Sequence, residues 1–197
     1  MLRGDRATNL FRQPLGSGAF QRAENGLQPL KLTGTSGKDT LTGQAKADTL
    51  SGLAGNDTLI GNQGNDTLIG GSGADTYRFK RGDGQDTIIE NDINILSKDV
   101  LAFGDVASNQ LWFSQSGQNL VVSVIGTQDK VTVQDWFKGS AYKVEAFTSS
   151  DGKSLSSSKV NSLVSAMAKF SAPAEGTTTL PTATAKALQP VLASSWA

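Results

Sequence analysis

Five aspartates recur at a spacing of nine residues and form the most regular chemical pattern in the sequence. Most stand in the frame Gly-x-x-Gly-x-Asp-Thr-Leu, in which glycines precede the acid and an apolar residue follows it. The five are Asp39, Asp48, Asp57, Asp66 and Asp75. Carboxylates and the carbonyls of glycine-rich turns are oxygen ligands, and calcium takes about six to eight oxygens in flexible geometry. The pattern therefore predicts calcium binding.

The repeats follow one another without a gap. They are Gly34 to Thr42, Gly43 to Ser51, Gly52 to Ile60, Gly61 to Ile69 and Gly70 to Arg78. The second repeat has Lys46 where the others have glycine, which predicts a weaker turn because glycine reaches positive φ more readily. A further turn, Gly82 to Ile88, is out of register, since its Asp86 follows Asp75 by eleven residues. We interpret it as a closing turn and Asp86 as a sixth candidate ligand.

A fixed nonapeptide period of this composition is typical of a parallel β-roll, in which each repeat contributes a turn and a short strand. Side chains alternate between the two faces of a strand. The residue after each threonine is therefore expected to point inward and the threonine itself outward. The inward residues are Leu41, Leu50, Leu59, Leu68 and Tyr77. The predicted core of the roll is one side chain deep.

Over residues 34 to 90 the chain resembles the RTX family of hemolysin-type calcium-binding proteins, which are exported by type I secretion systems. The resemblance implies that two repeats form one coil, so that repeats eighteen residues apart stack and share ions. It implies roughly three or four calcium ions with mixed carboxylate and carbonyl ligands. The stacked pairs would be Asp39 with Asp57, Asp48 with Asp66, Asp57 with Asp75, and Asp66 with Asp86.

Stacking brings like charges together. Two carboxylates at the strand spacing of about 4.8 Å would repel by about 3.5 kcal/mol at an effective dielectric constant of about 20. Residues 47 to 77 contain no Lys, Arg or Glu, so a bound cation is expected to balance this charge. We therefore expect the repeats to be disordered without calcium and to fold when they bind it.

From residue 87 to residue 150 the glycines become sparse and short strand patterns follow, separated by turn signals. The predicted strands are Thr87 to Glu90, Val100 to Phe103, Gln110 to Ser114, Leu120 to Ile125, Lys130 to Val133 and Tyr142 to Phe147. Through KDVLAFGDV, NLVVSVIG, KVTVQDWF and YKVEAF, this stretch resembles the segment that follows the repeats in many RTX proteins. It is expected to cap the open edge of the roll.

Two groups of residues in this capping stretch have predicted roles. The large aromatic residues are expected to lie in the core, although an aromatic pair could also contact a carbohydrate or a membrane. They are Trp112, Trp136 and Phe137. The scattered acids are expected to be turn residues rather than further ligands. They are Asp99, Asp105, Asp129 and Asp135.

Beyond Asp151 the sequence predicts helices. Ser158 to Phe170 has apolar residues at helical spacing and serines that can cap its start. Ala183 to Trp196 is weakly amphipathic, with a predicted break at Pro190. The RTX resemblance places an uncleaved secretion signal near the C-terminus, and the alternative for this segment is a frayed tail.

The composition excludes several classes of function. The chain has no histidine and no cysteine, which removes Ser-His-Asp catalysis, Cys-His catalysis and most zinc sites. We therefore expect no enzyme activity. The net charge is zero and no apolar run approaches the ~20 residues that span a bilayer, so neither nucleic acid nor membrane is an expected partner. Residues 1 to 30 lack the apolar segment of a cleavable signal peptide.

The predicted fold is all-β: a parallel β-roll of calcium-binding nonapeptide repeats, followed by a β-rich capping segment and a short helical tail. Its predicted segments are a linker or fragment of a parent protein (residues 1–33), the roll (34–90), the cap (91–150) and the tail with its secretion signal (151–197).

The expected function is that of a calcium-binding module of a secreted or cell-surface protein. It would fold after type I secretion and stabilise a larger toxin, lipase, protease or adhesin. Its expected partners are the secretion machinery, through the C-terminus, and a host or matrix surface, through the parent protein. The alternative is an adhesin or extracellular-matrix module that itself contacts a surface glycan or protein.

Overall fold

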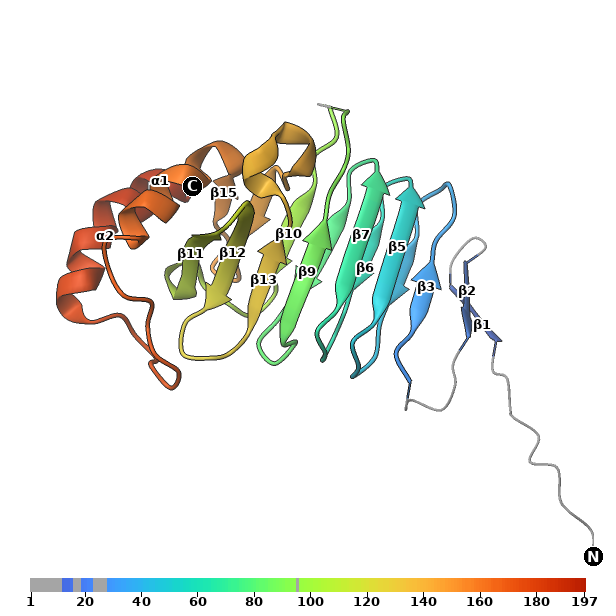
Figure 1. Ribbon diagram of the computed structural model, residues 1–197, viewed down its shortest axis with the longest axis horizontal. Helices are drawn as coiled ribbons and strands as arrows, with labels where there is room; N and C mark the ends of the chain where they lie inside the picture. The colour runs from blue at the N-terminus through green and yellow to red at the C-terminus, as the bar shows by residue number, and fades with distance from the viewer. Residues whose placement is uncertain (1–11, 16–18, 23–27, 95) are drawn as a thin grey trace, which may run out of the picture.

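The computed structural model describes residues 12–15, 19–22, 28–94 and 96–197. Figure 1 shows a row of short parallel strands that runs from the N-terminal side of the molecule to a cap covered by two helices. The strands form a seven-stranded sheet and a six-stranded sheet, and successive repeats alternate between them. Both sheets contribute to one hydrophobic core. The fold is therefore the predicted β-roll, extended by a β-rich cap and a short helical tail.

The seven-stranded sheet has the order β11 (Leu111–Ser116), β12 (Asn119–Val124), β13 (Lys130–Val133), β9 (Gln85–Ile89), β7 (Thr67–Ser72), β5 (Thr49–Ala54) and β3 (Lys31–Thr33). The six-stranded sheet has the order β15 (Ser154–Ser156), β14 (Ala146–Thr148), β10 (Val100–Phe103), β8 (Thr76–Phe79), β6 (Thr58–Ile60) and β4 (Thr40–Thr42). In the seven-stranded sheet, neighbouring strands pair in parallel along the row β3, β5, β7, β9 and β13. In the six-stranded sheet, they pair in parallel along the row β4, β6, β8, β10 and β14. Within these two sheets, the antiparallel pairs are β13 with β12, β12 with β11, and β14 with β15.

The register confirms that repeats eighteen residues apart stack. Thr40 pairs with Thr58, and Thr58 pairs with Thr76. At the closing turn the offset becomes twenty residues, since Thr67 pairs with Thr87. The five residues predicted to point inward are at most 2% exposed. A single layer of apolar side chains between two narrow sheets, mostly leucines, thus forms the core of the repeats.

The cap continues the roll without a break. Strand β10 pairs in parallel with β8, and β13 pairs in parallel with β9, which covers both exposed edges of the last coil. Trp112 and Trp136 are buried as predicted, and Phe137 is partly buried against the core.

Two of the predicted strands, Val100–Phe103 and Lys130–Val133, have the observed bounds. The strand predicted over Tyr142 to Phe147 is wrong before Ala146. A 3₁₀ turn, η3 (Ser140–Tyr142), ends at Tyr142, residues 143–145 are irregular, and β14 begins only at Ala146. The backbone N–H groups of Glu145 and Ala146 both donate to the carbonyl of Asp99, each at 3.0 Å. This shared acceptor interrupts regular pairing ahead of β14.

Two helices pack against the cap. Helix α1 (Ser157–Met167) follows β15, and the Ser156 side chain accepts a hydrogen bond from the Ser158 backbone N–H at its start. Helix α2 (Thr182–Ser195) is continuous, so the predicted break at Pro190 is wrong. A proline removes one hydrogen bond from a helix interior, and α2 accommodates it while Leu188 stays buried. After α2, Ala197 exchanges two backbone hydrogen bonds with Ser154, which pairs the C-terminus with the edge strand β15.

The N-terminal segment has more structure than the predicted linker. Strand β1 (Arg12–Leu15) pairs antiparallel with β2 (Ala19–Arg22), and the roll begins at β3, ahead of the predicted start at Gly34. The other residues predicted to form the linker before position 28 lie outside the described residues. Neither helix in the described ranges combines the length and apolar character needed to cross a membrane.

Candidate calcium-binding ladders

Five of the six candidate aspartates end a turn and stand directly before a strand. Asp39, Asp57 and Asp75 precede β4, β6 and β8 of the six-stranded sheet. The others, Asp48 and Asp66, precede β5 and β7 of the seven-stranded sheet, and Asp86 lies within β9. All six are at most 2% exposed. Such burial of a charged side chain requires compensation by hydrogen bonds or an opposite charge.

Stacked aspartates along the six-stranded sheet form what we call the first ladder. The Asp39 backbone N–H donates to Asp57 Oδ1 at 2.7 Å, and the Asp57 N–H donates to Asp75 Oδ1 at 2.8 Å. Each carboxylate therefore hydrogen-bonds to the turn one coil earlier. These contacts join the residues that the eighteen-residue stacking rule paired.

The second ladder runs along the seven-stranded sheet. The Asp48 N–H donates to Asp66 Oδ1 at 2.7 Å, and the Asp66 N–H donates to Asp86 Oδ1 at 3.0 Å. At its open end, the Leu30 N–H donates to Asp48 Oδ1 at 2.6 Å. Asp86 thus belongs to the stack although it is out of the nonapeptide register, because the twenty-residue offset absorbs the two extra residues.

One oxygen of most of these carboxylates has no hydrogen-bond partner among the described residues. These buried atoms are Asp39 Oδ1 and the Oδ2 atoms of Asp57, Asp66, Asp75 and Asp86. Buried polar atoms in native proteins nearly always have a partner, so a row of unpaired carboxylate oxygens indicates that a cation belongs beside them. The donor set therefore fits a hard, oxygen-seeking ion such as calcium.

Backbone oxygens crowd the same positions. A Cβ built at Gly43 would lie 2.5 Å from the carbonyl oxygen of Gly61 and 2.8 Å from Asp48 Oδ2. A Cβ at Gly52 would meet the Gly70 carbonyl oxygen at 2.6 Å. Glycine is thus required where a turn carbonyl and an aspartate carboxylate approach each other. Within the described residues no three acidic side chains converge on one point, so any bound ion depends on these carbonyls.

The turn that contains Lys46 corrects one sequence-based expectation. The matching glycine of the third repeat, Gly55, has φ of +119°, and that of the fourth, Gly64, has φ of +154°. Lys46 is not among the non-glycine residues with positive φ. The argument that lysine weakens this turn by backbone strain therefore does not hold in this structure.

The ladders raise the pKa values of their own carboxyl groups. Burial raises the pKa of Asp66 and that of Asp75 to about 6, and stacked Asp48 and Asp57 add repulsion to each in turn. Burial raises the pKa of Asp86 to about 8, with Asp66 as a further cause. Among the described residues, ion pairs join Lys138 to Asp135 and Lys153 to Asp151, and none involves a ladder aspartate. The residues that the structure describes therefore supply no countercharge to the ladders.

Asp99 was predicted to be a turn residue, and the structure instead places it in the first ladder. It is 2% exposed, and its Oδ1 accepts a hydrogen bond from the Asp75 N–H at 2.7 Å. Its own N–H donates to Glu145 Oε2 at 2.9 Å. The available sequence signal was Lys98-Asp99-Val100-Leu101, which repeats the pattern of Lys38-Asp39-Thr40-Leu41 outside the nonapeptide period.

The other three aspartates that were expected to be turn residues hold turns and connections. Asp105 accepts a hydrogen bond from the Arg81 N–H at 3.0 Å, and Asp129 accepts one from the Gly82 N–H at 2.8 Å. Asp135 has φ of +58° at the start of η2 (Trp136–Lys138). Their positions agree with the predicted turn roles.

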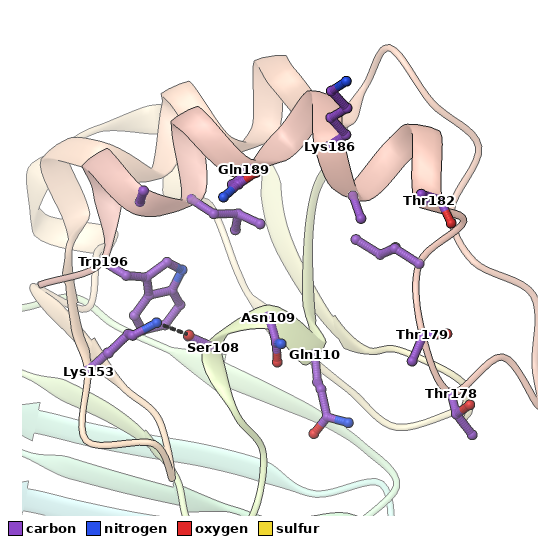
Figure 2. Close-up of a pocket in the computed structure, with 14 residues that line it drawn as sticks. Ser108, Asn109, Gln110, Lys153, Thr178, Thr179, Thr182, Lys186, Gln189 and Trp196 are labelled. Carbon is purple, nitrogen blue, oxygen red and sulfur yellow. Dashed lines mark hydrogen bonds between the residues drawn. The ribbon is translucent and has the colours of Figure 1, made fainter.

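A cavity of about 610 Å³ lies away from the ladders, between α2 and the segment that begins at Ser108. Figure 2 shows Asn109, Gln110, Lys153 and Trp196 around it. Its lining includes no carboxylate, so it is not a calcium site. The sequence pattern had not indicated it.

Comparison with known families identifies the repeats. Residues 33–68, 42–77 and 51–88 match the model of the RTX calcium-binding nonapeptide repeat in four copies. Residues 119–159 match the haemolysin-type calcium binding protein related domain. Residues 33–88 are therefore RTX hemolysin-type nonapeptide repeats, and RTX repeats bind calcium. Such repeats are typical of proteins secreted by type I systems.

Individual relatives match only parts of the chain. The iron-regulated protein FrpA of Neisseria meningitidis serogroup C is 39% identical over 93 residues, which are 45% of this chain and 8% of FrpA. The chain thus corresponds to a small part of that relative's length.

Two solved structures are similar in part. The AlgE6R3 subunit of the Azotobacter vinelandii mannuronan C5-epimerase has a TM-score of 0.41 and 28% identity, over 52% of this chain and 68% of that one. The extracellular lipase LipA of Serratia marcescens has a TM-score of 0.31 and 24% identity, over 58% of this chain and 21% of that one.

Proposed function

We propose that this chain is the calcium-dependent folding module of a larger exported protein. The observation that carries the proposal is the row of buried carboxylate oxygens without partners along both ladders. These groups disfavour the metal-free fold and favour one that contains cations. The same residues would therefore make the fold depend on the calcium concentration around the chain.

The ladders assign the candidate ligands. The stacked pairs Asp39 with Asp57, Asp57 with Asp75, Asp48 with Asp66, and Asp66 with Asp86 would each hold one ion between adjacent coils. Carbonyl oxygens of the glycine-containing turns would complete each site. When bound, calcium supplies the positive charge that the repeats lack. This arrangement gives four ions in the repeats, the upper end of the roughly three or four that the RTX resemblance implies.

The proposed role in export follows from the same charges. A chain whose stacked carboxylates repel stays extended where calcium is scarce, which suits passage through a type I channel, and folds where calcium is abundant. The C-terminal region would be recognised by the export machinery before its helices pack. In the folded chain the C-terminal region is engaged in contacts within the chain, since Trp196 is 6% exposed and Ala197 pairs with β15. Recognition and folding would thus be successive uses of one segment.

No catalytic role is proposed for the chain itself. The ladder carboxylates are committed to backbone N–H groups of adjacent coils, and the chain has no histidine or cysteine to act with them. The enzymatic, toxic or adhesive activity would belong to the parent protein.

Far-UV circular dichroism with increasing calcium tests the proposal. The β signal should rise cooperatively, with a midpoint of order 10⁻⁴ to 10⁻³ M, as in extracellular calcium modules. Magnesium at equal concentration is the control and should not fold the roll, because it demands a tighter octahedral shell. A full β signal in excess chelator, or full folding by magnesium alone, would contradict the proposal.

A further inference from the structure

The first ladder continues beyond the last repeat. In the six-stranded sheet Thr76 pairs with Val100, and Val100 pairs with Ala146. Asp99 therefore follows Asp75 in the stack, as Asp75 follows Asp57. Even the hydrogen bond is repeated, since the Asp75 N–H donates to Asp99 Oδ1 at 2.7 Å and the Asp57 N–H donates to Asp75 Oδ1 at 2.8 Å. The rung supplied by the cap has the same backbone geometry as a rung supplied by a repeat.

The second ladder ends at the same level. In the seven-stranded sheet Val131 of β13 pairs with Asp86 of β9. A valine therefore stands where the next carboxylate would be, and Val131 is 1% exposed within the hydrophobic core. Among the described residues, only the first ladder continues into the cap with a stacked aspartate.

Glu90 lies beside the extended end of the first ladder. The pairing of Ile69 with Ile89 places Glu90 at the register position of Gly70, the first residue of the fifth repeat. The side chain is 1% exposed. Its Oε1 accepts a hydrogen bond from the Tyr77 hydroxyl, and that hydroxyl also accepts one from the Gly70 N–H at 2.9 Å. Its Oε2 has no partner among the described residues.

The surroundings of Glu90 are acidic. Its pKa is raised to about 9, chiefly by burial and also by the charges of Asp99, Asp75 and Glu145, while the Tyr77 hydrogen bond opposes this rise. Asp75 Oδ2 is likewise buried without a partner among the described residues. The turn at the junction of roll and cap thus carries a third carboxylate where a regular repeat has glycine.

We propose that Glu90, Asp75 and Asp99 bind an additional calcium ion at the junction of the roll and the cap. This inference rests on the proposed calcium-binding function of the repeats. Among the described residues no three acidic side chains already converge on one point, so binding would draw the three carboxylates together around the ion. Backbone oxygens of the two adjacent turns would supply the remaining ligands. The Tyr77 hydroxyl holds Glu90 in position from the side of the roll.

The junction site differs from the repeat sites in charge. A stacked pair of repeats offers two carboxylates, whereas the junction offers three, and calcium affinity rises with the number of charged ligands. The junction is therefore expected to fill at lower calcium than the repeats. Because Asp99 belongs to the cap and Asp75 to the roll, the ion would also join the two segments.

Counting bound ions tests the proposal. Native mass spectrometry of the whole chain at saturating calcium should show one ion fewer in Glu90→Gln and in Asp99→Asn than in the unmodified chain. Glu90→Gln keeps the size of the side chain and an acceptor for Tyr77. Asp105→Asn is the matched control, because Asp105 is an exposed carboxylate of the cap that accepts one backbone N–H outside the ladders; it should keep the full count.

Equal counts in all four chains would overturn the junction site and would reduce Glu90 to a buried hydrogen-bond acceptor of Tyr77. If neither junction variant folds at saturating calcium, the unmodified chain decides the question. The four stacked pairs of the repeats plus the junction give five ions, and a count of four or fewer overturns the site. A count of zero would instead overturn the proposed function of the repeats.

Discussion

The roll and the cap are built by the same parallel stacking of short strands, yet different interactions hold them together. In the roll, the strands add inward apolar side chains, mostly leucines, to a single layer, and the turns add buried carboxylates. In the cap, aromatic side chains form a compact cluster. The ring centroids of Phe113 and Phe147 are 5.7 Å apart, those of Trp136 and Phe147 are 5.7 Å apart, and Trp196 lies 6.2 Å from Phe113.

This difference separates two kinds of stability. Aromatic pairs in edge-to-face geometry stabilise a fold in any solvent that preserves the hydrophobic effect. Stacked carboxylates stabilise nothing until a cation balances them. The cap should therefore depend on packing and the roll on calcium, and each of the following variants probes one side of that contrast.

The largest effect is expected from the cap core. Phe147→Ala removes a fully buried ring that contacts both Phe113 and Trp136. Such truncations cost about 3–5 kcal/mol because they leave a cavity. Urea unfolding at saturating calcium, followed by tryptophan fluorescence, should show this loss, since all three tryptophans lie outside the repeats. A loss below about 1 kcal/mol would mean that the cap does not depend on this cluster.

Within the roll, the position of an aspartate in its ladder should decide its importance. Asp57 stacks on both Asp39 and Asp75, whereas Asp39 stacks only on Asp57 among the described residues. Asp57→Ala should raise the calcium midpoint more than Asp39→Ala, by about 1–3 kcal/mol in folding free energy. Parallel calcium titrations by circular dichroism measure both. Equal midpoints would argue against ions shared between stacked pairs.

Acidification should stabilise the metal-free roll, whereas it should weaken calcium binding to the roll. The folded-state pKa of Asp75 is raised to about 6 and that of Asp86 to about 8, against an ordinary value of 3.8. At pH values between the ordinary pKa and these raised pKa values, the folded state binds more protons than the unfolded chain. The stability of the metal-free fold therefore falls as the pH rises through this range. Lowering the pH from about 8 to about 5 should therefore increase the β signal of the metal-free chain.

With calcium present, the same acidification should raise the calcium midpoint, because ligand carboxylates must be deprotonated. Circular dichroism in metal-depleted buffer, and calcium titrations at each pH, give the two arms. A metal-free chain that loses β signal on acidification would show that the ladder charges do not limit the fold.

The smallest effect is expected at Lys46. Because Lys46 does not have positive φ, replacing it with glycine relieves no strain and only adds freedom to the unfolded chain. Lys46→Gly should destabilise the calcium-bound roll by about 0.5–1 kcal/mol. Lys46→Ala removes the charge without that freedom and serves as the control. A clear gain of stability in Lys46→Gly would show that the turn needs glycine after all.

The repeats were predictable because their information is local. The nonapeptide period identifies the turn, the strand and the carboxylate within each short segment, so the inward leucines and the eighteen-residue register followed from the residues together with the RTX resemblance. Residues without that period gave weaker predictions. Asp99 and Glu145 entered the ladder through pairing with β8 and β10, and no local spacing announces such pairing.

The sequence by itself therefore determined the chemistry of the roll: which residues face inward, which carboxylates stack and which ion they suit. Only the tertiary structure decided where the ladders end, with Asp99 and Glu145 on one side and Val131 on the other. It also decided that α2 runs through Pro190 and that Ala197 closes the edge of β15. The physical reason is that periodic positions are set by contacts between equivalent short segments, whereas the cap is set by contacts between distant and unlike ones.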